Sequence, residues 1–274
     1  MKRILVPTDF SKHAEEALKS AVQIAKKNGS EIFLLHLLEL PHQLHDAMTN
    51  GSSIPEVMLF IKKAHEKLQK IKEQPHLQGI TISTTVQFER AFDGILSFNK
   101  KNNIDLIVMG SSGSSGIEEM LIGSNTEKVV RLSDIPVLVV KKDLDTFNIK
   151  NIVFASDFTK EIKKPFLKMI EFANIFDANL ALVMICTPNS FKTTAIAEKT
   201  MKDFIADFEV KKYSIILYND SNIEKGIRNF TNTIGADLIG LCTHGRTGLS
   251  HFFNGSIGED LVNHSTKPVI TFKI

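Results

Sequence analysis

The chain has 274 residues, 43% hydrophobic and 23% charged, which is typical of a folded globular protein and excludes a disordered chain. A net charge of +2 is too small for a nucleic-acid surface, and two cysteines are too few for a disulfide framework. The N-terminus lacks the apolar run of a signal peptide, and no stretch reaches the ~18 apolar residues of a membrane span. We therefore expect a cytoplasmic protein that binds neither nucleic acid nor membrane.

Short apolar runs in the first half predict five strands, at Ile4–Val6, Ile32–Leu38, Ile82–Phe88, Leu106–Met109 and Val137–Val140. Most of these runs are continuous and do not alternate with polar residues, which indicates a mostly parallel sheet buried between helices. After the first strand, small residues at helical spacing predict a helix packed closely on the sheet, with an inner face of Ala14, Ala17, Leu18, Ala21, Ile24 and Ala25. Open parallel sheets bind ligands beyond the carboxyl ends of their strands, so chemistry is expected near Asp9, Leu37 and Gly110.

The second half of the chain repeats the first. Asp9 corresponds to Asp157, an offset of 148 residues, whereas Gly123 corresponds to Gly255, an offset of 132. The difference predicts sixteen extra residues in the first half, for which Pro41–Glu56 is the obvious place. We therefore expect two tandem α/β domains.

The predicted domains comprise residues 1–142 and 149–274. The charged stretch from Lys141 to Asn148 is the predicted linker. The run from Glu56 to Glu73, rich in lysine, predicts a solvated amphipathic helix.

Residues 110–124 read GSSGSSGIEEMLIGS. A flexible linker is the simplest alternative interpretation, but this run follows a predicted strand and precedes a predicted helix. Glycines let backbone N–H groups converge on one anion, and a helix N-terminus adds free N–H groups and a positive dipole end. Ser124 and Glu127 also have the spacing of a capping box, so Ser124 is expected to cap the helix beside a bound anion.

This loop differs from the two familiar phosphate motifs. The chain has neither the Walker-type Gly-x-x-x-x-Gly-Lys-Ser/Thr nor the dinucleotide spacing Gly-x-Gly-x-x-Gly at this loop. No lysine stands in the loop to reach a γ-phosphate, and no base is evident to activate water. The pattern favours a site that holds a nucleotide over one that hydrolyses it quickly.

The spacing Gly110-x2-Gly113-x9-Gly123-Ser124 resembles the Gly-x2-Gly-x9-Gly-Ser/Thr pattern of ATP-binding members of the universal stress protein family. The opening ILVPTDFS and the Leu-Leu-His at the second strand are also similar, and the resemblance covers nearly the whole chain, twice. It implies two Rossmann-like, adenine nucleotide alpha hydrolase-like domains, with ATP held mainly in the first half and Mg²⁺ on its phosphates. The residues that it implies for this site are Pro7, Thr8, Asp9, Leu37, Met109, Gly110, Gly113, Gly123, Ser124 and Asn125.

The second half departs from this pattern. Cys242 replaces the first glycine and Ala155 replaces Pro7. A side chain at position 242 would crowd the approach to a phosphate or ribose, so a second site is expected to bind ATP less tightly. Its residues would be Asp157, Ile185, Gly245, Gly255 and Ser256.

The resemblance also implies a pairing of the halves and a function. In the family the last strands pair across a dimer, so Pro136–Val140 and Pro268–Phe272 are expected to pair within this chain as a pseudo-dimer, which would leave room for a homodimer of such units. The implied function is an ATP-binding stress-response sensor or regulator that acts on an unidentified protein partner. Two alternatives stay open: a protein-interaction module without nucleotide, and an enzyme such as a slow or autophosphorylating ATPase, although we expect no catalytic residues.

Three further side chains have alternative interpretations. Asp9 would also serve as a cap of the first helix. His36, at the end of an apolar strand, is typical of a core histidine with a satisfied hydrogen bond, and no set of metal ligands is evident. Cys242 is expected to be a small buried residue, with a reactive thiol as the alternative.

Overall fold

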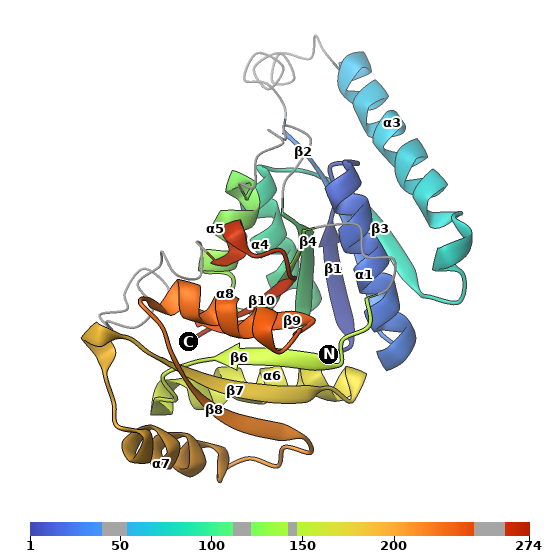
Figure 1. Ribbon diagram of the computed structural model, residues 1–274. Helices are drawn as coiled ribbons and strands as arrows, with labels where there is room; N and C mark the ends of the chain where they lie inside the picture. Colours follow the sequence, from blue (N-terminus) through green and yellow to red (C-terminus); the bar gives the residue numbers. More distant parts are fainter. Residues whose placement is uncertain (40–53, 112–121, 142–146, 244–260) are drawn as a thin grey trace.

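The computed structural model describes residues 1–39, 54–111, 122–141, 147–243 and 261–274. Figure 1 shows two α/β units joined along one continuous sheet, with the amino-terminal half in blue to green and the carboxyl-terminal half in yellow to red. Within the described ranges, no helix is long and apolar enough to cross a lipid bilayer.

The first half alternates strands and helices in the predicted order. Its strands are β1 (Arg3–Pro7), β2 (Glu31–Leu38), β3 (Ile82–Phe88), β4 (Leu106–Gly110) and β5 (Val137–Val140). Its helices are α1 (Lys12–Asn28), α3 (Ile54–Lys72), α4 (Ala91–Asn102) and α5 (Ser124–Leu132), with a 3-10 turn at Pro75–Leu77. All five predicted strands are confirmed to within one residue at either end.

The second half repeats this order. Its strands are β6 (Asn151–Ala155), β7 (Asn179–Cys186), β8 (Tyr213–Asn219), β9 (Leu238–Thr243) and β10 (Val269–Lys273). Its helices are α6 (Lys163–Phe176), α7 (Thr194–Ile205) and α8 (Ile223–Thr233), with 3-10 turns at Lys160–Ile162 and Pro188–Ser190. Residues 261–264 are also helical. The two tandem α/β units inferred from the internal repeat are therefore present in the structure.

The strands form one ten-stranded sheet in the order β3-β2-β1-β4-β5-β10-β9-β6-β7-β8. Neighbouring strands within each half run parallel, whereas β5 and β10 run antiparallel where the halves meet. The paired residues at this junction are Val137 with Thr271, Leu138 with Ile270 and Val139 with Val269. The predicted pairing of the last strands is confirmed, and the chain forms a pseudo-dimer.

Helices cover both faces of the sheet, which explains the uninterrupted apolar strands. Buried residues of α1, α3, α6 and α7 join one core cluster, and those of α4, α5 and α8 join another on the opposite face. All six residues of the predicted inner face of α1 are buried. The mostly parallel sheet between two helix layers is therefore confirmed.

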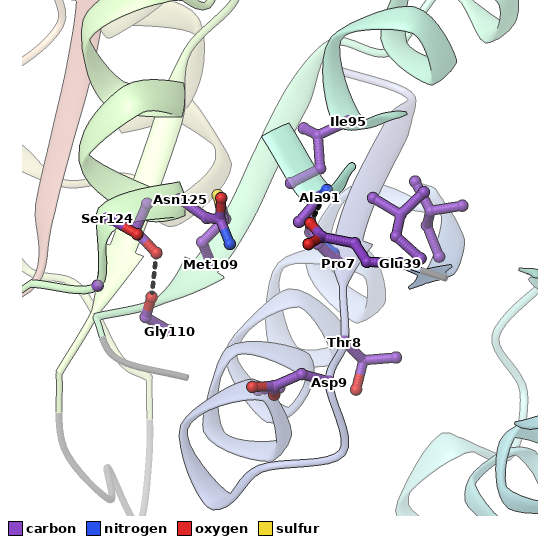
Figure 2. A pocket seen from close by; sticks show the side chains of 15 residues that line it. Pro7, Thr8, Asp9, Glu39, Ala91, Ile95, Met109, Gly110, Ser124 and Asn125 are labelled. Carbon is purple, nitrogen blue, oxygen red and sulfur yellow. Dashed lines mark hydrogen bonds between the residues drawn. The ribbon is translucent and has the colours of Figure 1, made fainter. Parts of the chain in front are cut away.

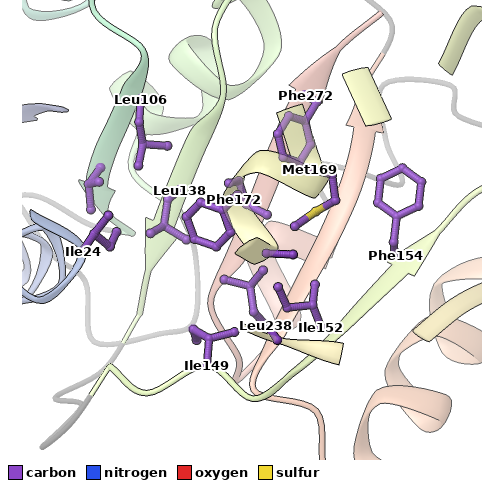
Figure 3. Packing of buried hydrophobic residues seen from close by; sticks show 14 of the residues in the cluster. Ile24, Leu106, Leu138, Ile149, Ile152, Phe154, Met169, Phe172, Leu238 and Phe272 are labelled. Atoms are coloured by element: carbon purple, nitrogen blue, oxygen red, sulfur yellow. The ribbon is translucent and has the colours of Figure 1, made fainter. Parts of the chain in front are cut away.

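The core on the α1 side continues from one half into the other. Ile24 of α1, Leu138 of β5, Phe172 of α6 and Phe272 of β10 belong to a single buried cluster (Figure 3). Phe147, at the end of the predicted linker, is buried as well, and its N–H donates to Gln23 Oε1 at 2.7 Å. Burial of each large apolar side chain contributes roughly 1.5–3 kcal/mol, so this shared core holds the halves together.

Part of the extra length of the first half lies in a helix. The equivalent helices α3 and α7 have 19 and 12 residues. The prediction placed all the extra residues in Pro41–Glu56, but Glu56 already belongs to α3, and residues 40–53 lie outside the described part of the chain. The amphipathic helix predicted from Glu56 to Glu73 is confirmed as α3.

Candidate functional site

A cavity of about 320 Å³ opens at the carboxyl ends of β1 and β4. The strand order changes direction here, because β2 and β3 lie on one side of β1 while β4 and β5 lie on the other. Loops that leave the two strands diverge at such a switch point and leave a crevice, which is where open α/β sheets bind ligands. The volume lies within the ~300–1,000 Å³ typical of small-molecule sites.

The cavity collects the residues that the sequence assigned to a nucleotide site (Figure 2). Nine of the ten line it: Pro7, Thr8, Asp9, Leu37, Met109, Gly110, Gly123, Ser124 and Asn125. The tenth, Gly113, lies outside the described residues. Segments more than a hundred residues apart in sequence therefore form one concave surface.

A tight turn after β1 carries Asp9 to the edge of this cavity. The Asp9 Oδ1 atom accepts a hydrogen bond from the N–H of Ser11 at 3.0 Å, and the Ser11 Oγ atom accepts one from the N–H of Ala14 at 3.2 Å. The N-cap of α1 is therefore Ser11, which excludes the interpretation of Asp9 as the cap. Phe10, between them, has a φ of 65°, a left-handed conformation that is uncommon for residues other than glycine.

His36 contacts two residues of the same turn, Thr8 and Phe10. Its Nδ1 atom lies 2.7 Å from the carbonyl oxygen of Thr8, and because a carbonyl only accepts hydrogen bonds, Nδ1 carries the proton. The ring packs against Phe10, with a centroid distance of 4.4 Å. Burial lowers the pKa of His36, which favours the neutral ring. His36 is thus a core histidine with a satisfied hydrogen bond, as predicted.

The end of β4 approaches the first turn of α1 too closely for any side chain. A Cβ atom at position 110 would lie 2.6 Å from the carbonyl oxygen of His13 and 2.7 Å from its carbonyl carbon. The Gly110 carbonyl in turn accepts a hydrogen bond from the Thr126 Oγ1 atom at 3.0 Å. Gly110 therefore holds β4, α1 and α5 together at the mouth of the cavity.

The N-terminus of α5 differs from the prediction. Its N-cap is Gly123, which has no side chain to form a capping hydrogen bond, and Ser124 is already the first helical residue. The predicted capping box of Ser124 and Glu127 is therefore wrong. The N–H of Gly123 donates to the Ser111 carbonyl at 2.7 Å, which draws the two ends of the glycine loop together. Without a side-chain cap, the first N–H groups of α5 remain available to a ligand.

Three residues that shape the cavity were missed from the sequence. The Glu39 Oε1 atom accepts a hydrogen bond from the N–H of Ala91 at 2.7 Å, at the start of α4, and both residues line the cavity. A Cβ atom at Gly94 would lie 2.4 Å from a methyl carbon of Leu37, so this glycine lets α4 approach the end of β2. The repeat contained a signal for it, because Gly226, at the same offset of 132, would meet Ile185 at 2.5 Å.

The described residues include only part of the second site expected from the sequence. Gly245, Gly255 and Ser256 lie outside the described residues, whereas Asp157 follows β6 in the same kind of turn as Asp9, with a φ of 58° at Phe158. The side chain of Cys242, at the position of Gly110, is buried. Burial and the nearby carboxylate of Asp157 raise the pKa of the Cys242 thiol. It is a small buried residue, as predicted, and not an activated nucleophile.

Within the described ranges, no group of three or more His, Cys, Asp or Glu side chains is arranged to hold a metal ion. The Mg²⁺ implied by the resemblance stays a prediction. The cavity offers two carboxylates, of Asp9 and Glu39.

Comparison with known proteins places these features in a family. The model of the universal stress protein family matches residues 1–141 and again residues 148–273. Universal stress protein MJ0531 of Methanocaldococcus jannaschii is 34% identical over 142 residues, which span 52% of this chain and 82% of that protein. Universal stress protein Slr1230 of Synechocystis is 22% identical over an alignment that covers 100% of both chains.

Solved structures agree on the fold. The crystal structure of a universal stress protein from Archaeoglobus fulgidus superposes with a TM-score of 0.76 at 22% identity, covering 99% of this chain and 98% of that one. Because the family model matches both halves separately, this chain belongs to the universal stress protein family and carries two copies of its domain in tandem.

Proposed function

We propose that the first half binds ATP in the cavity between β1, β4 and α5, and that the protein acts as an ATP-binding sensor or regulator in a stress response. The observation that carries the proposal is the convergence of the predicted residues, from Pro7 to Asn125, on one cavity of suitable size. The resemblance of the glycine spacing to that of ATP-binding family members favours ATP among adenine nucleotides.

The phosphates would lie against the start of α5. No described residue accepts a hydrogen bond from the backbone N–H groups of Ser124, Asn125 or Thr126. A helix N-terminus with free N–H groups and a positive dipole end suits a phosphate anion. Gly123 leaves the backbone accessible, because it has no side chain to keep a phosphate away.

The base and ribose would lie nearer β1 and β2. The apolar side chains of Leu37, Ile95 and Met109 line this part of the cavity, together with Pro7. Apolar walls with a few polar groups are typical of sites that bind a flat heterocycle. The neighbouring polar groups of Thr8 and Asp9 are suited to hydroxyl groups of a ribose.

Charge balance supports a metal–nucleotide complex as the ligand. The described lining includes Asp9 and Glu39 but no lysine or arginine. A triphosphate would therefore need Mg²⁺ in addition to the helix dipole, and Mg²⁺ commonly combines phosphate oxygens, water and one or two carboxylates. In such a complex the metal would supply charge neutralisation, and the chain would supply positioning.

The substitution Asn125→Asp tests the proposal sharply. It keeps the shape of the side chain but puts a negative charge at the start of α5, which favours the helix by about 0.3–1 kcal/mol and repels phosphate. We expect calorimetry to show at least tenfold weaker binding of Mg-ATP, with unchanged binding of adenosine and an unfolding temperature that does not fall.

A matched control is Asn222→Asp, which makes the same change at the N-cap of α8, in the second half. It is expected to leave ATP affinity unchanged. The proposal is wrong if the unaltered protein gives no heat with millimolar Mg-ATP and mass spectrometry finds no nucleotide in the purified protein.

One observation favours the alternative of a protein-interaction module. Met58, Leu59 and Phe60, at the start of α3, expose 61%, 50% and 47% of their surface. Adjacent exposed apolar side chains are characteristic of surfaces that bind other proteins. This alternative would be supported by a protein partner that does not bind the Phe60→Ser variant and whose affinity for the unaltered protein is the same with and without ATP. Turnover of ATP above ~1 s⁻¹, within the usual enzyme range, would instead support an enzyme.

A further inference from the structure

The second half of the chain holds the base of the glycine loop of the first half. The N–H of Ile122 donates a hydrogen bond to the Asn263 Oδ1 atom at 3.0 Å. Ile122 immediately precedes Gly123, the N-cap of α5, whereas Asn263 lies in the helical residues 261–264 near the end of the chain. This end of the chain, in red in Figure 1, lies against α5.

A second bond fixes Asn263 itself. Its backbone carbonyl accepts a hydrogen bond from the Lys141 ammonium group, which follows β5 at the junction of the halves. Lys141 is half-buried, so its side chain has little freedom to leave this position. Asn263 therefore contacts two segments of the first half: its backbone carbonyl binds Lys141, and its side chain binds Ile122.

Two further hydrogen bonds at the base of the loop join described residues of the first half to one another. The N–H of Ser111 donates to the Val140 carbonyl at 3.0 Å, and the N–H of Gly123 donates to the Ser111 carbonyl at 2.7 Å. Of the three hydrogen bonds described for the base of the loop, the one donated by the Ile122 N–H reaches the other half. Because Ser124 and Asn125 follow directly, a shift of Ile122 would move the N–H groups proposed to bind phosphate.

The equivalent positions of the first half carry different side-chain chemistry. At the offset of 132, the position of Asn263 corresponds to Arg131 in the first half, and that of Lys141 to Lys273. A guanidinium group has no acceptor for a backbone N–H, so Arg131 has no means of forming the bond that Asn263 forms. Lys273 pairs instead with the Asp134 carboxylate at 2.8 Å. Asn263 therefore has no equivalent acceptor side chain at the matching position of the first half, and the counterpart of Ile122 lies outside the described residues.

We propose that Asn263 is a positioning residue through which the second half sets the phosphate affinity of the first, an inference that rests on the proposed ATP site. The helical residues 261–264 follow the second half's own glycine segment, just as α5 follows the loop of the first half. A ligand or partner that moves these residues would therefore change how tightly the first half holds a nucleotide. Regulation of the site would arise inside one chain.

The test compares Asn263→Ala with Asn263→Asp in the full chain. Alanine removes the acceptor, and we expect about fivefold weaker binding of Mg-ATP, the effect of losing one ordinary hydrogen bond. Aspartate keeps an acceptor oxygen at the same place, so it is expected to restore affinity to within about twofold of the unaltered protein. Adenosine, which has no phosphate, should bind all three proteins equally, because a purely structural defect would weaken both ligands.

The control is Asn232→Ala, at an exposed asparagine on α8, which should change neither ligand. Equal affinity of Asn263→Ala and the unaltered protein for Mg-ATP would overturn the inference.

Amide exchange measured by NMR separates this inference from the ATP proposal, because it needs no ligand. Exchange of the Ile122 amide should be at least tenfold faster in Asn263→Ala and unchanged in the other two variants. If the unaltered protein binds no ATP, the proposed function fails by itself. Unchanged exchange of Ile122 in Asn263→Ala would overturn the positioning role in either case.

Discussion

Gly110 lies against the backbone of His13, with room for neither a methyl group nor anything larger, since a Cβ atom would stand 2.6 Å from the His13 carbonyl oxygen. The glycine pattern of the first half thus has a packing role in addition to its proposed role in phosphate binding. In the second half Cys242 takes this position, and the helix there begins with a 3-10 turn at Lys160–Ile162 in place of a first α-helical turn. The half with the larger side chain, Cys242, is thus the half in which the first helix begins differently.

The substitution Gly110→Ala is expected to lower the free energy of unfolding by about 1–3 kcal/mol, because the added methyl group meets backbone atoms that have no freedom to turn aside. Gly240→Ala is a matched control in β9. A Cβ atom there would meet the Met169 Sδ atom at 2.8 Å, in a flexible side chain that is able to repack. Urea denaturation followed by circular dichroism measures both, and equal losses would contradict this role of the His13 backbone.

Gly94 and Leu37 are expected to be energetically coupled. Alanine is a better helix former than glycine by about 1 kcal/mol, but in Gly94→Ala this gain is opposed by the contact with the Leu37 methyl carbons at 2.4 and 3.0 Å. In a Leu37→Ala background the clash is absent, so Gly94→Ala should then raise the free energy of unfolding. A double-mutant cycle by urea denaturation is expected to give a coupling of about 1–2 kcal/mol.

The equivalent pair in the second half, Gly226 and Ile185, serves as the comparison for this cycle, because a Cβ atom at Gly226 would meet Ile185 at 2.5 Å. Its coupling should have the same sign. Purely additive effects in both halves would show that α4 and α8 shift away from the sheet at no measurable cost.

Lys141 should give the protein a distinctive pH dependence. Burial lowers the pKa of Lys141 from 10.5 to about 8. Between these values the unfolded chain holds a proton that the folded chain has released, so the contribution of Lys141 to stability rises with pH across this window and is constant below about pH 8. The free energy of unfolding of the unaltered protein, relative to Lys141→Met, is therefore expected to increase from pH 8 to pH 10. If the difference in free energy of unfolding between the two proteins stays constant from pH 8 to pH 10, the Lys141 ammonium group is well hydrated and its pKa is not lowered.

The sequence by itself determined the architecture. Apolar runs are a local signal of strands in a buried sheet, so the strands of the first half and the inner face of α1 were predictable, although β3 is rich in polar residues. The internal repeat supplied two readings of each element and thereby predicted the tandem domains. The glycine loop and the carboxyl ends of the strands indicated where the site lies, and the resemblance to the family implied its ten residues, of which nine line the cavity.

Only the tertiary structure decided how those residues are supported. Ser124 has the spacing of a capping residue, yet α5 begins one residue earlier, with Gly123 as its N-cap and the Gly123 N–H bonded to the distant Ser111 carbonyl. The need for glycine at Gly110 and the bond from Ile122 to Asn263 both join elements that are far apart in the chain. Such contacts depend on the distance between each helix and the sheet and on the arrangement of the two halves. The residue pattern of a single segment specifies neither of them.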